Sequence, residues 1–420
     1  MATSTMPSSR PLIPVAAAGV RDPRPGLSGL PPDRIEAWLA ERGEPAYRAR
    51  QLSVGLWSSA AGLDDLDTLP GRLRRTLADE FRFDTIVATD VRPADEGLTE
   101  KALHHLSDGR SVESVLMRYP ARAGRRERAT VCISSQAGCA VGCPFCATGE
   151  LGFWRDLETA EILDQVRFWS RHLAAEGRHI TNVVFMGMGE PLLNADRVLE
   201  AASALSDPAR FGLGARHITI STSGVEPGIR RLTALAPRYT LAVSLHAARS
   251  ELRRVLVPLE DRWRAADVVT SAADYARVTG RRVTYEYVMI AAINDTPRDA
   301  RETAQLLRGR LAHVNLIPMN PVAHTPWQPS SPDRIEAFAA VLRAAGLSTT
   351  IRRNRGVEIG AACGQLAAEQ AGRPTAVAVA RRRDLLVRRS AAALRGSAPP
   401  EPAGPSGRAG PAALTDASTG

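Results

Sequence analysis

Short apolar runs alternate with amphipathic stretches through the middle of the chain, which predicts a repeated strand–helix unit. The predicted strands are Thr130–Ser134, Asn182–Met186, His217–Ser221, Thr240–Leu245, Val283–Met289, His313–Ile317 and a last one around Thr349–Arg353. The predicted helices are Thr159–Leu173, Asp196–Ser206, Pro227–Leu235, Ala265–Thr279, Pro297–Gly309 and Pro332–Ala345. This alternation predicts an α/β protein with a parallel sheet and helical crossovers. Six units fit an open, partial (βα)6 barrel over residues 125–365, although a flat doubly wound sheet fits the pattern as well.

The segments on either side of this repeat have other patterns. Helical spacing of apolar residues predicts a small N-terminal helical domain over residues 29–83. Alternating runs around the turn sequence Ser107–Arg110 predict a β-hairpin extension over residues 84–124. Residues 1–28 and 373–420 are rich in Pro, Gly, Ala and Ser or Arg, so we expect them to be disordered.

The charge balance adds a candidate partner. The net charge is +9 and almost all of the positive charge is arginine, because Lys101 is the only lysine. A basic excess favours a polyanionic partner such as RNA. The helical domain carries arginines that are predicted to be exposed, either as an RNA-docking surface or as an ordinary solvated face: Arg48, Arg50, Arg72, Arg74 and Arg75.

The five cysteines and the lack of long apolar runs indicate the compartment. No run approaches the ~20 apolar residues that a membrane span needs, and the N-terminus lacks the apolar core of a secretory signal. An odd number of cysteines, three of them in one loop, is a poor disulfide framework and suits a reducing compartment. We therefore expect a cytoplasmic protein without membrane contact.

Three cysteines follow the first predicted strand at the spacing C-x3-C-x2-C: Cys139, Cys143 and Cys146. Three thiolates can hold three corners of a [4Fe–4S] cluster, which otherwise takes four cysteines. The open iron can then chelate the amino and carboxylate groups of S-adenosylmethionine. This spacing resembles that of the radical SAM enzymes. The alternative is a structural zinc site with Cys132 as the fourth ligand, in a zinc-stabilised RNA-binding protein without catalysis.

Small polar residues follow the later strands, at the ends where a parallel barrel carries its active site. After the second strand, glycine at position 189 allows close approach of a ligand, and Glu190 can accept hydrogen bonds from an ammonium group or a ribose. The other candidate cofactor contacts at this rim are Ser221, Ser244, Leu245, His246 and Asn320. Any one of them alone would be an ordinary loop residue, but together they predict a ring of ligand contacts.

Several motifs resemble the RlmN/Cfr family of radical SAM RNA methyltransferases, over about residues 29–372. Besides the cysteine loop, they are Cys132-Ile-Ser-Ser-Gln-Ala-Gly-Cys139, Gly187-Met-Gly-Glu-Pro191, Ser244-Leu-His-Ala247, Asn315-Leu-Ile-Pro318 and Ala361-Ala-Cys363-Gly-Gln-Leu366. The resemblance implies a radical SAM barrel that methylates C2 of adenine in 23S rRNA and tRNA. The Cfr branch methylates C8 instead and is the alternative, but Glu190-Pro191, Ser221-Thr-Ser223 and Pro318 look like the C2-methylating versions. Gly360 departs from the family, which more often has Asp there.

The resemblance also implies roles for the remaining cysteines and a base. Adenine C2 is electron-poor and cannot attack a sulfonium methyl group, so a radical route is needed. One S-adenosylmethionine methylates Cys363, and a second supplies the 5′-deoxyadenosyl radical that removes hydrogen from the S-methyl group. The methylene radical adds to C2, Glu113 accepts the C2 proton, and Cys132 releases the RNA by forming a disulfide with Cys363. An external electron donor such as flavodoxin or ferredoxin and a monomeric state are also implied.

Overall fold

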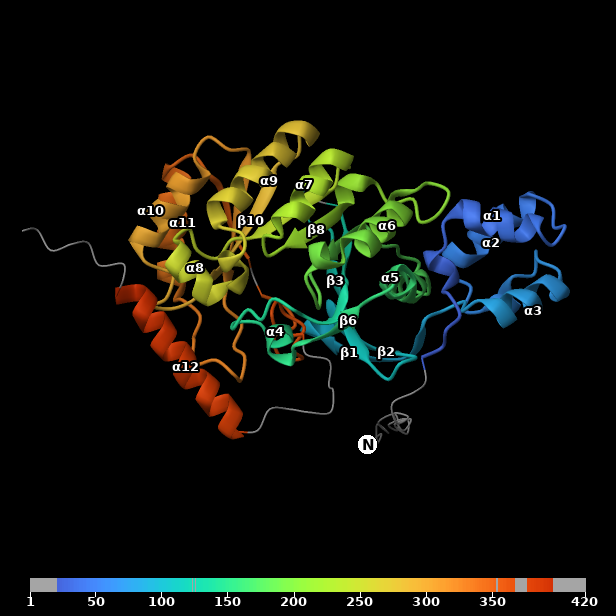
Figure 1. The fold of residues 1–420 in the computed structure, drawn as a ribbon, viewed down its shortest axis with the longest axis horizontal. Coiled ribbons are helices and arrows are strands. Elements are labelled where there is room, and N and C mark those ends of the chain that lie inside the picture. The colour runs from blue at the N-terminus through green and yellow to red at the C-terminus, as the bar shows by residue number, and fades with distance from the viewer. Residues whose placement is uncertain (1–20, 123, 125, 353, 367–375, 396–420) are drawn as a thin grey trace, which may run out of the picture.

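A mixed sheet of ten strands runs through the middle of the molecule, with helices packed outside it (Figure 1). The structure, a computed structural model, describes residues 21–122, 124, 126–352, 354–366 and 376–395. The disorder predicted for residues 1–28 is wrong for residues 21–28, because Leu27 is buried and its N–H donates to the carbonyl oxygen of Arg82 at 2.9 Å. Residues 1–20, 373–375 and 396–420, also predicted to be disordered, lie outside the described residues. Among the described helices, none is both long and apolar enough to cross a lipid bilayer.

The residues before the sheet form a helical module, as the sequence predicts. Its helices are α1 (Pro32–Ala40), α2 (Tyr47–Trp57) and α3 (Gly71–Glu80). Their inner faces make a small apolar core of their own, which includes Leu39, Leu52, Leu56, Leu73 and Leu77. In Figure 1 this module lies at one side of the barrel, beyond helices α5 (Thr159–Ala174) and α6 (Ala195–Ser206).

The strands of the large sheet lie side by side in chain order. They are β1 (Ile86–Ala94), β2 (Thr99–Leu106), β3 (Ser111–Tyr119), β4 (Arg128–Cys132), β7 (Asn182–Phe185), β8 (Ile218–Thr222), β9 (Thr240–Ser244), β10 (Val283–Met289), β11 (Ala312–Pro318) and β12 (Ser348–Ile351). The pairs from β1 to β4 are antiparallel, and all pairs from β4 to β12 are parallel. A separate two-stranded ribbon is formed by β5 (Gln136–Gly138) and β6 (Phe153–Asp156).

Helices connect the parallel strands and cover the outside of the sheet. They are α4 (Ala147–Leu151), α5 (Thr159–Ala174), α6 (Ala195–Ser206), α7 (Glu226–Leu235), α8 (Ser250–Leu256), α9 (Ala265–Thr279), α10 (Pro297–Leu307) and α11 (Pro332–Ala344). A doubly wound sheet would reverse its strand order at a switch point, whereas the order here never reverses. The prediction of an open partial barrel is therefore confirmed, and the doubly wound alternative is wrong.

The predicted β-hairpin of residues 84–124 proves to be part of a larger feature. β2 and β3 form the hairpin, but β1 adds a third antiparallel strand, and β3 pairs directly with β4 of the barrel. The sequence gives little sign of β1 because Asp90 and Pro93 are residue types that strands disfavour. β1 tolerates them as an edge strand with one unpaired side. The extension is thus continuous with the barrel sheet.

Part of the C-terminal tail is helical, contrary to the prediction. Residues Ala376–Arg395, which lie within the stretch predicted to be disordered, form helix α12. Alanine, leucine and arginine are good helix formers, and the prolines and glycines of the tail lie outside this helix. Leu386 is buried in an apolar cluster with Leu252 and Leu256 of α8. Packing against the barrel therefore offsets the low complexity of the segment.

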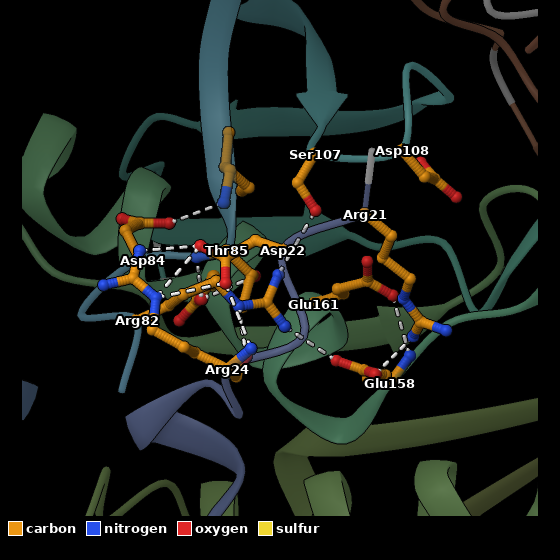
Figure 2. A network of polar contacts seen from close by, with 12 residues as sticks. Arg21, Asp22, Arg24, Arg82, Asp84, Thr85, Ser107, Asp108, Glu158 and Glu161 are labelled. Carbon is orange, nitrogen blue, oxygen red and sulfur yellow. Dashed lines mark hydrogen bonds and ion pairs between the residues drawn. The ribbon is translucent and has the colours of Figure 1, made fainter. Parts of the chain in front are cut away.

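Charged side chains join the helical module to the barrel (Figure 2). Arg82 donates to the carbonyl oxygen of Arg24 at 2.6 Å and to Glu158 of the barrel at 3.0 Å. Nearby, one carboxylate oxygen of Asp164 on α5 accepts hydrogen bonds from both the N–H and the hydroxyl of Thr85, at 2.8 and 2.7 Å. The chain that leaves the module is therefore held against α5.

Arg167 of α5 completes this junction from a buried position. Its guanidinium donates to Asp164 at 2.6 Å and to the carbonyl oxygens of Phe83 and Leu56, at 2.7 and 3.0 Å. One buried cation thus binds the barrel helix to two segments of the helical module.

Arg167→Met should destabilise the protein strongly, because it leaves Asp164 buried without its cation. Removal of one partner of a buried ion pair costs about 3–5 kcal/mol, which urea unfolding would measure. Arg277→Met, in an ion pair whose side chains are 74% and 55% exposed, is the matched control and should change stability by about 0–1 kcal/mol. Equal effects of the two substitutions would contradict the proposed importance of the junction.

Candidate active site

A cavity of about 160 Å³ opens at the carboxyl ends of the parallel strands. Loops that leave these ends converge on one rim of a parallel barrel. The predicted residues that line the cavity are Cys139, Cys143, Cys146, Gly189, Glu190, Ser221, Ser244, His246, Asn320 and Cys363. The structure therefore brings the two ends of the barrel segment together around one space.

The three clustered cysteines lie in the loop between β5 and α4. The N–H of Cys139 donates to the carbonyl oxygen of Gly152 at 2.7 Å, and the N–H of Cys146 donates to that of Cys143 at 3.1 Å. These backbone bonds hold the loop in shape. All three side chains are free thiols, and burial raises the pKa of each, to about 12 for Cys139.

The donor set fits a [4Fe–4S] cluster, because three thiolates line one cavity. Among the described residues, no three His, Cys, Asp or Glu side chains converge closely enough to bind a single metal ion. Around a four-iron cube each thiolate binds a different iron, so the sulfur atoms stand farther apart than around one zinc ion. Cys132, the fourth ligand of the alternative zinc site, is absent from the cavity lining.

Glu190 presents a buried carboxylate to the cavity. Gly189 before it has φ 104°, which only glycine adopts readily, and a Cβ there would lie 2.6 Å from the Cβ of Gln136. The Glu190 carboxylate accepts the N–H groups of Leu192 and Ser223 at 3.1 and 2.6 Å. Burial raises its pKa, and these hydrogen bonds oppose the rise. An ionised carboxylate has about four acceptor sites, so an ammonium group can still bind it.

Arg253 of α8 binds the loops that follow β8 and β9. Its guanidinium donates to the carbonyl oxygens of Leu245 and Ser223, at 3.0 and 2.8 Å. It also forms an ion pair of 2.7 Å with Glu260, in which both side chains are fully buried. Leu245 itself is buried and does not line the cavity, so its predicted contact with a cofactor remains a prediction.

His246 is held as a neutral ring. Its backbone has φ 59°, and its ring packs edge-on against Phe145 of the cysteine loop, with centroids 4.8 Å apart. Its Nδ1 accepts the N–H of Val288 at 3.0 Å. Burial lowers its pKa to about 3. The ring therefore acts as a wall between the cysteine loop and β10.

The segment that carries Cys363 is clamped onto this rim. Asn320 donates through Nδ2 to the carbonyl oxygen of Cys363 at 2.9 Å. The N–H of Ala147 in α4 donates to the carbonyl oxygen of Gly364 at 2.6 Å, and the hydroxyl of Thr148 donates to that of Leu366 at 2.6 Å. The half-buried Cys363 thiol thus faces the same cavity as the three clustered cysteines.

Glu113 and Cys132 do not line the cavity. They lie on neighbouring strands behind it, because Val115 of β3 pairs with Cys132 of β4 and Glu113 stands two residues from Val115. Residues two apart on a strand, and residues paired across strands, point to the same face of a sheet. Burial raises the pKa of Cys132 to about 12, and the nearby Cys363 adds to this effect. The Cys132 and Cys363 thiols are therefore close enough for a charge on Cys363 to raise the pKa of Cys132.

Two charged residues of the cavity wall were missed by the sequence analysis, Glu286 and Arg352. Glu286 pairs in register with Ser244, and burial raises its pKa. The pKa of Arg352 is raised, chiefly by the charge of Cys363. Glu286 could have been found from the sequence because it is a charged residue within the otherwise apolar strand Val283–Met289. Arg352 could have been found because it follows the end of a parallel strand, where a barrel carries its active site.

The cavity offers matching groups for S-adenosylmethionine beside the cysteines. Within the described part of the chain, Oδ1 of Asn320 is buried without a hydrogen-bond partner. Glu190 offers a carboxylate to an ammonium group, and Ser221, Ser223 and Ser244 offer hydroxyl groups. The close backbone approach at Gly189 leaves no room for a side chain. These features fit a polar ligand with an amino acid part.

Comparison with known proteins agrees with this arrangement. A model of the radical SAM superfamily matches residues 133–307. The chain is 46% identical to "Probable dual-specificity RNA methyltransferase RlmN" of Parafrankia sp., over 87% of this chain and 97% of that protein. It is 43% identical to "Ribosomal RNA large subunit methyltransferase N" of Nitrosopumilus maritimus, over 82% of this chain and 99% of that protein.

A solved radical SAM methyltransferase from Sphaerobacter thermophilus has the same fold, with a TM-score of 0.79 and 43% identity over 82% of this chain and all of that chain. The superfamily implies a [4Fe–4S] cluster and S-adenosylmethionine as cofactors, and the residues of the cavity fit both. The chain belongs to the RlmN family of dual-specificity radical SAM RNA methyltransferases.

Proposed function

We propose that this enzyme methylates C2 of an adenine in 23S rRNA and in tRNA, through S-methylated Cys363 and a covalent RNA adduct. The observation that carries the proposal is the position of Cys363, which is clamped at the rim of a cavity also lined by the three clustered cysteines and Glu190. A thiol in this place can receive a methyl group and then meet a radical generated in the same cavity.

The bound cofactors supply the difficult part of the chemistry, because a reduced [4Fe–4S] cluster and S-adenosylmethionine together generate a 5′-deoxyadenosyl radical. Cys139, Cys143 and Cys146 would hold the cluster, and Glu190 would orient the methionine ammonium group. The Cys363 sulfur would accept a methyl group from one S-adenosylmethionine by displacement, with S-adenosylhomocysteine as the leaving group. A second S-adenosylmethionine would supply the radical chemistry that removes a hydrogen atom from this methyl group. The sulfur-bound carbon then forms a bond to adenine C2.

Glu113 of the strand extension and Cys132 of the first barrel strand would release the methylated RNA. Glu113 would accept the C2 proton, and the adduct radical would pass one electron to the oxidised [4Fe–4S] cluster that the three clustered cysteines would hold. The Cys132 thiolate then attacks the Cys363 sulfur, so a disulfide forms while the bond from that sulfur to the transferred carbon breaks. A proton from solvent completes the new methyl group. The shared sheet face of Glu113 and Cys132 and the proximity of Cys132 to Cys363 support these roles.

The net charge of +9 supports an RNA substrate. The target base must leave its stack to enter the cavity, which favours recognition of an RNA loop by shape and phosphate contacts. Of the arginines predicted to dock RNA, Arg50 and Arg75 are exposed, whereas Arg48 and Arg74 are partly buried and bind backbone carbonyls. Arg72 is exposed but pairs with Glu44. Fewer arginines of this module are therefore available for RNA phosphates than the sequence suggests.

Cys363→Ala should abolish methylation, by at least about 10³-fold, because it removes the atom that carries the methyl group. Iron and sulfide content and the visible absorption of the cluster should stay at wild-type levels, since Cys363 is not a predicted ligand. Methylation of RNA by this variant at an undiminished rate would rule out the S-methylcysteine route.

Cys132→Ala should trap the enzyme on its RNA, because the thiol that breaks the bond between carbon and sulfur is missing. A denaturing gel with labelled RNA should show a covalent protein–RNA species that persists after boiling. The double variant Cys132→Ala/Cys363→Ala should show none. Recovery of only free, unmodified RNA from Cys132→Ala would argue against its resolving role.

S-adenosylmethionine with a deuterated methyl group separates the possible chemistries. The route through a methylene radical should give 2-methyladenosine that keeps two of the three deuterium atoms, as measured by mass spectrometry of digested RNA against synthetic standards. Retention of all three would mean direct methyl transfer. Co-elution with 8-methyladenosine would instead establish C8 as the target carbon.

A further inference from the structure

The only lysine of the chain lies in a buried ion pair with the proposed base. Nζ of Lys101 on β2 is 2.8 Å from Oε1 of Glu113 on β3, and the two side chains are 12% and 3% exposed. Every other basic residue of the Lys or Arg type in the sequence is arginine. An ammonium is a compact point charge, whereas a guanidinium is a broad planar fork. The cation of this ion pair is therefore the only ammonium side chain in the sequence.

The register of the strand extension directs this pair toward the site. Lys101 pairs with Val115 of β3, and Val115 pairs with Cys132 of β4. Glu113 is two residues before Val115, so Lys101, Glu113 and Cys132 project from the same face of the sheet. The lysine, the base and the resolving cysteine thus share one surface.

The segment that leads to Cys363 packs on this surface. A Cβ placed on Gly360 would lie 3.6 Å from Nζ of Lys101, and one placed on Gly356 would lie 2.9 Å from Cγ2 of Thr99. Asp95 fastens the segment further, because its Oδ2 accepts the N–H of Gly356 at 3.0 Å. The ammonium group therefore lies between the Glu113 carboxylate and the segment that carries the methyl group. Gly360 is the position of this segment that faces the lysine.

We infer that Lys101 is a positioning residue that holds Glu113 as an oriented carboxylate beside the Cys363 segment, ready to accept the adenine C2 proton. A buried carboxylate without a cation takes up a proton or turns away, and it then cannot act as a base. This inference rests on the proposed function, because it assumes that Glu113 is the base. A phosphate contact to RNA is the other use of a lysine here, and it would act independently of Glu113.

The test compares Lys101→Met, Glu113→Gln and the double variant with the wild type. Lys101→Met should lower turnover by roughly 10²-fold, within the range that general-base catalysis contributes. Proton removal follows adduct formation, so the variant should accumulate the covalent protein–RNA adduct. Methylation of Cys363, measured by protein mass, and RNA binding should be unchanged. Lys101→Arg keeps the positive charge and should recover part of the turnover.

The double variant separates positioning from a direct role of the lysine. If Lys101 acts only through Glu113, Lys101→Met should have no further effect in the Glu113→Gln background. A neutral pair also relieves the buried charge, so this variant remains informative if Lys101→Met alone folds poorly. Val87→Thr, at a strand position that is 70% exposed, is the control and should match the wild type.

Each contrary result has a separate meaning. Wild-type turnover by Lys101→Met, or a further loss in the Glu113→Gln background, would overturn the positioning role. Weaker RNA binding by Lys101→Met without adduct accumulation would assign the lysine to the RNA instead. Normal turnover by Glu113→Gln would show that the base itself is wrongly assigned in the proposed function.

Discussion

Parallel pairing from β4 to β12 is the constraint on which the site depends. Because the strands keep one direction and one order, every loop that leaves a carboxyl end reaches the same rim. The pairing of Cys132 with Val184 also sets the distance between the first two loops. At Gly187 the backbones approach so closely that a Cβ would lie 2.7 Å from the carbonyl oxygen of Ile133. The cysteine loop and the Gly189–Glu190 turn are neighbours for this reason.

The antiparallel extension binds the segment that carries Cys363. The segment that follows β12 first contacts β11, where the N–H of Arg352 donates a hydrogen bond to the carbonyl oxygen of Leu316. Three residues later, Arg355 donates to the carbonyl oxygen of Arg118 on β3 at 2.8 Å. The segment thus crosses from the last parallel strands to the extension and carries Cys363 with it. A cysteine near one end of the barrel segment thereby reaches the strand that carries Cys132 near the other end.

The sequence was sufficient for the repeated strands and for the cysteine loop, because buried apolar runs and cysteine spacing are local patterns. It was insufficient where stability comes from distant packing, as in β1, whose polar residues are tolerated at a sheet edge, and α12, whose Leu386 is buried against α8. Glu286, Arg352 and the partnership of Lys101 with Glu113 were missed for a similar reason. Only the register between strands brings these ordinary charged residues to one place.

The two cysteines outside the cluster motif have environments that suit different tasks. Cys363 is half-buried at the cavity rim beside Arg352, whose raised pKa reflects that proximity, and thiols next to arginine are favoured as nucleophiles. Cys132 is buried in the sheet, and its pKa is raised to about 12. A neutral thiol is a poor nucleophile, so in the proposed mechanism Cys132 would leave the first methyl group to Cys363.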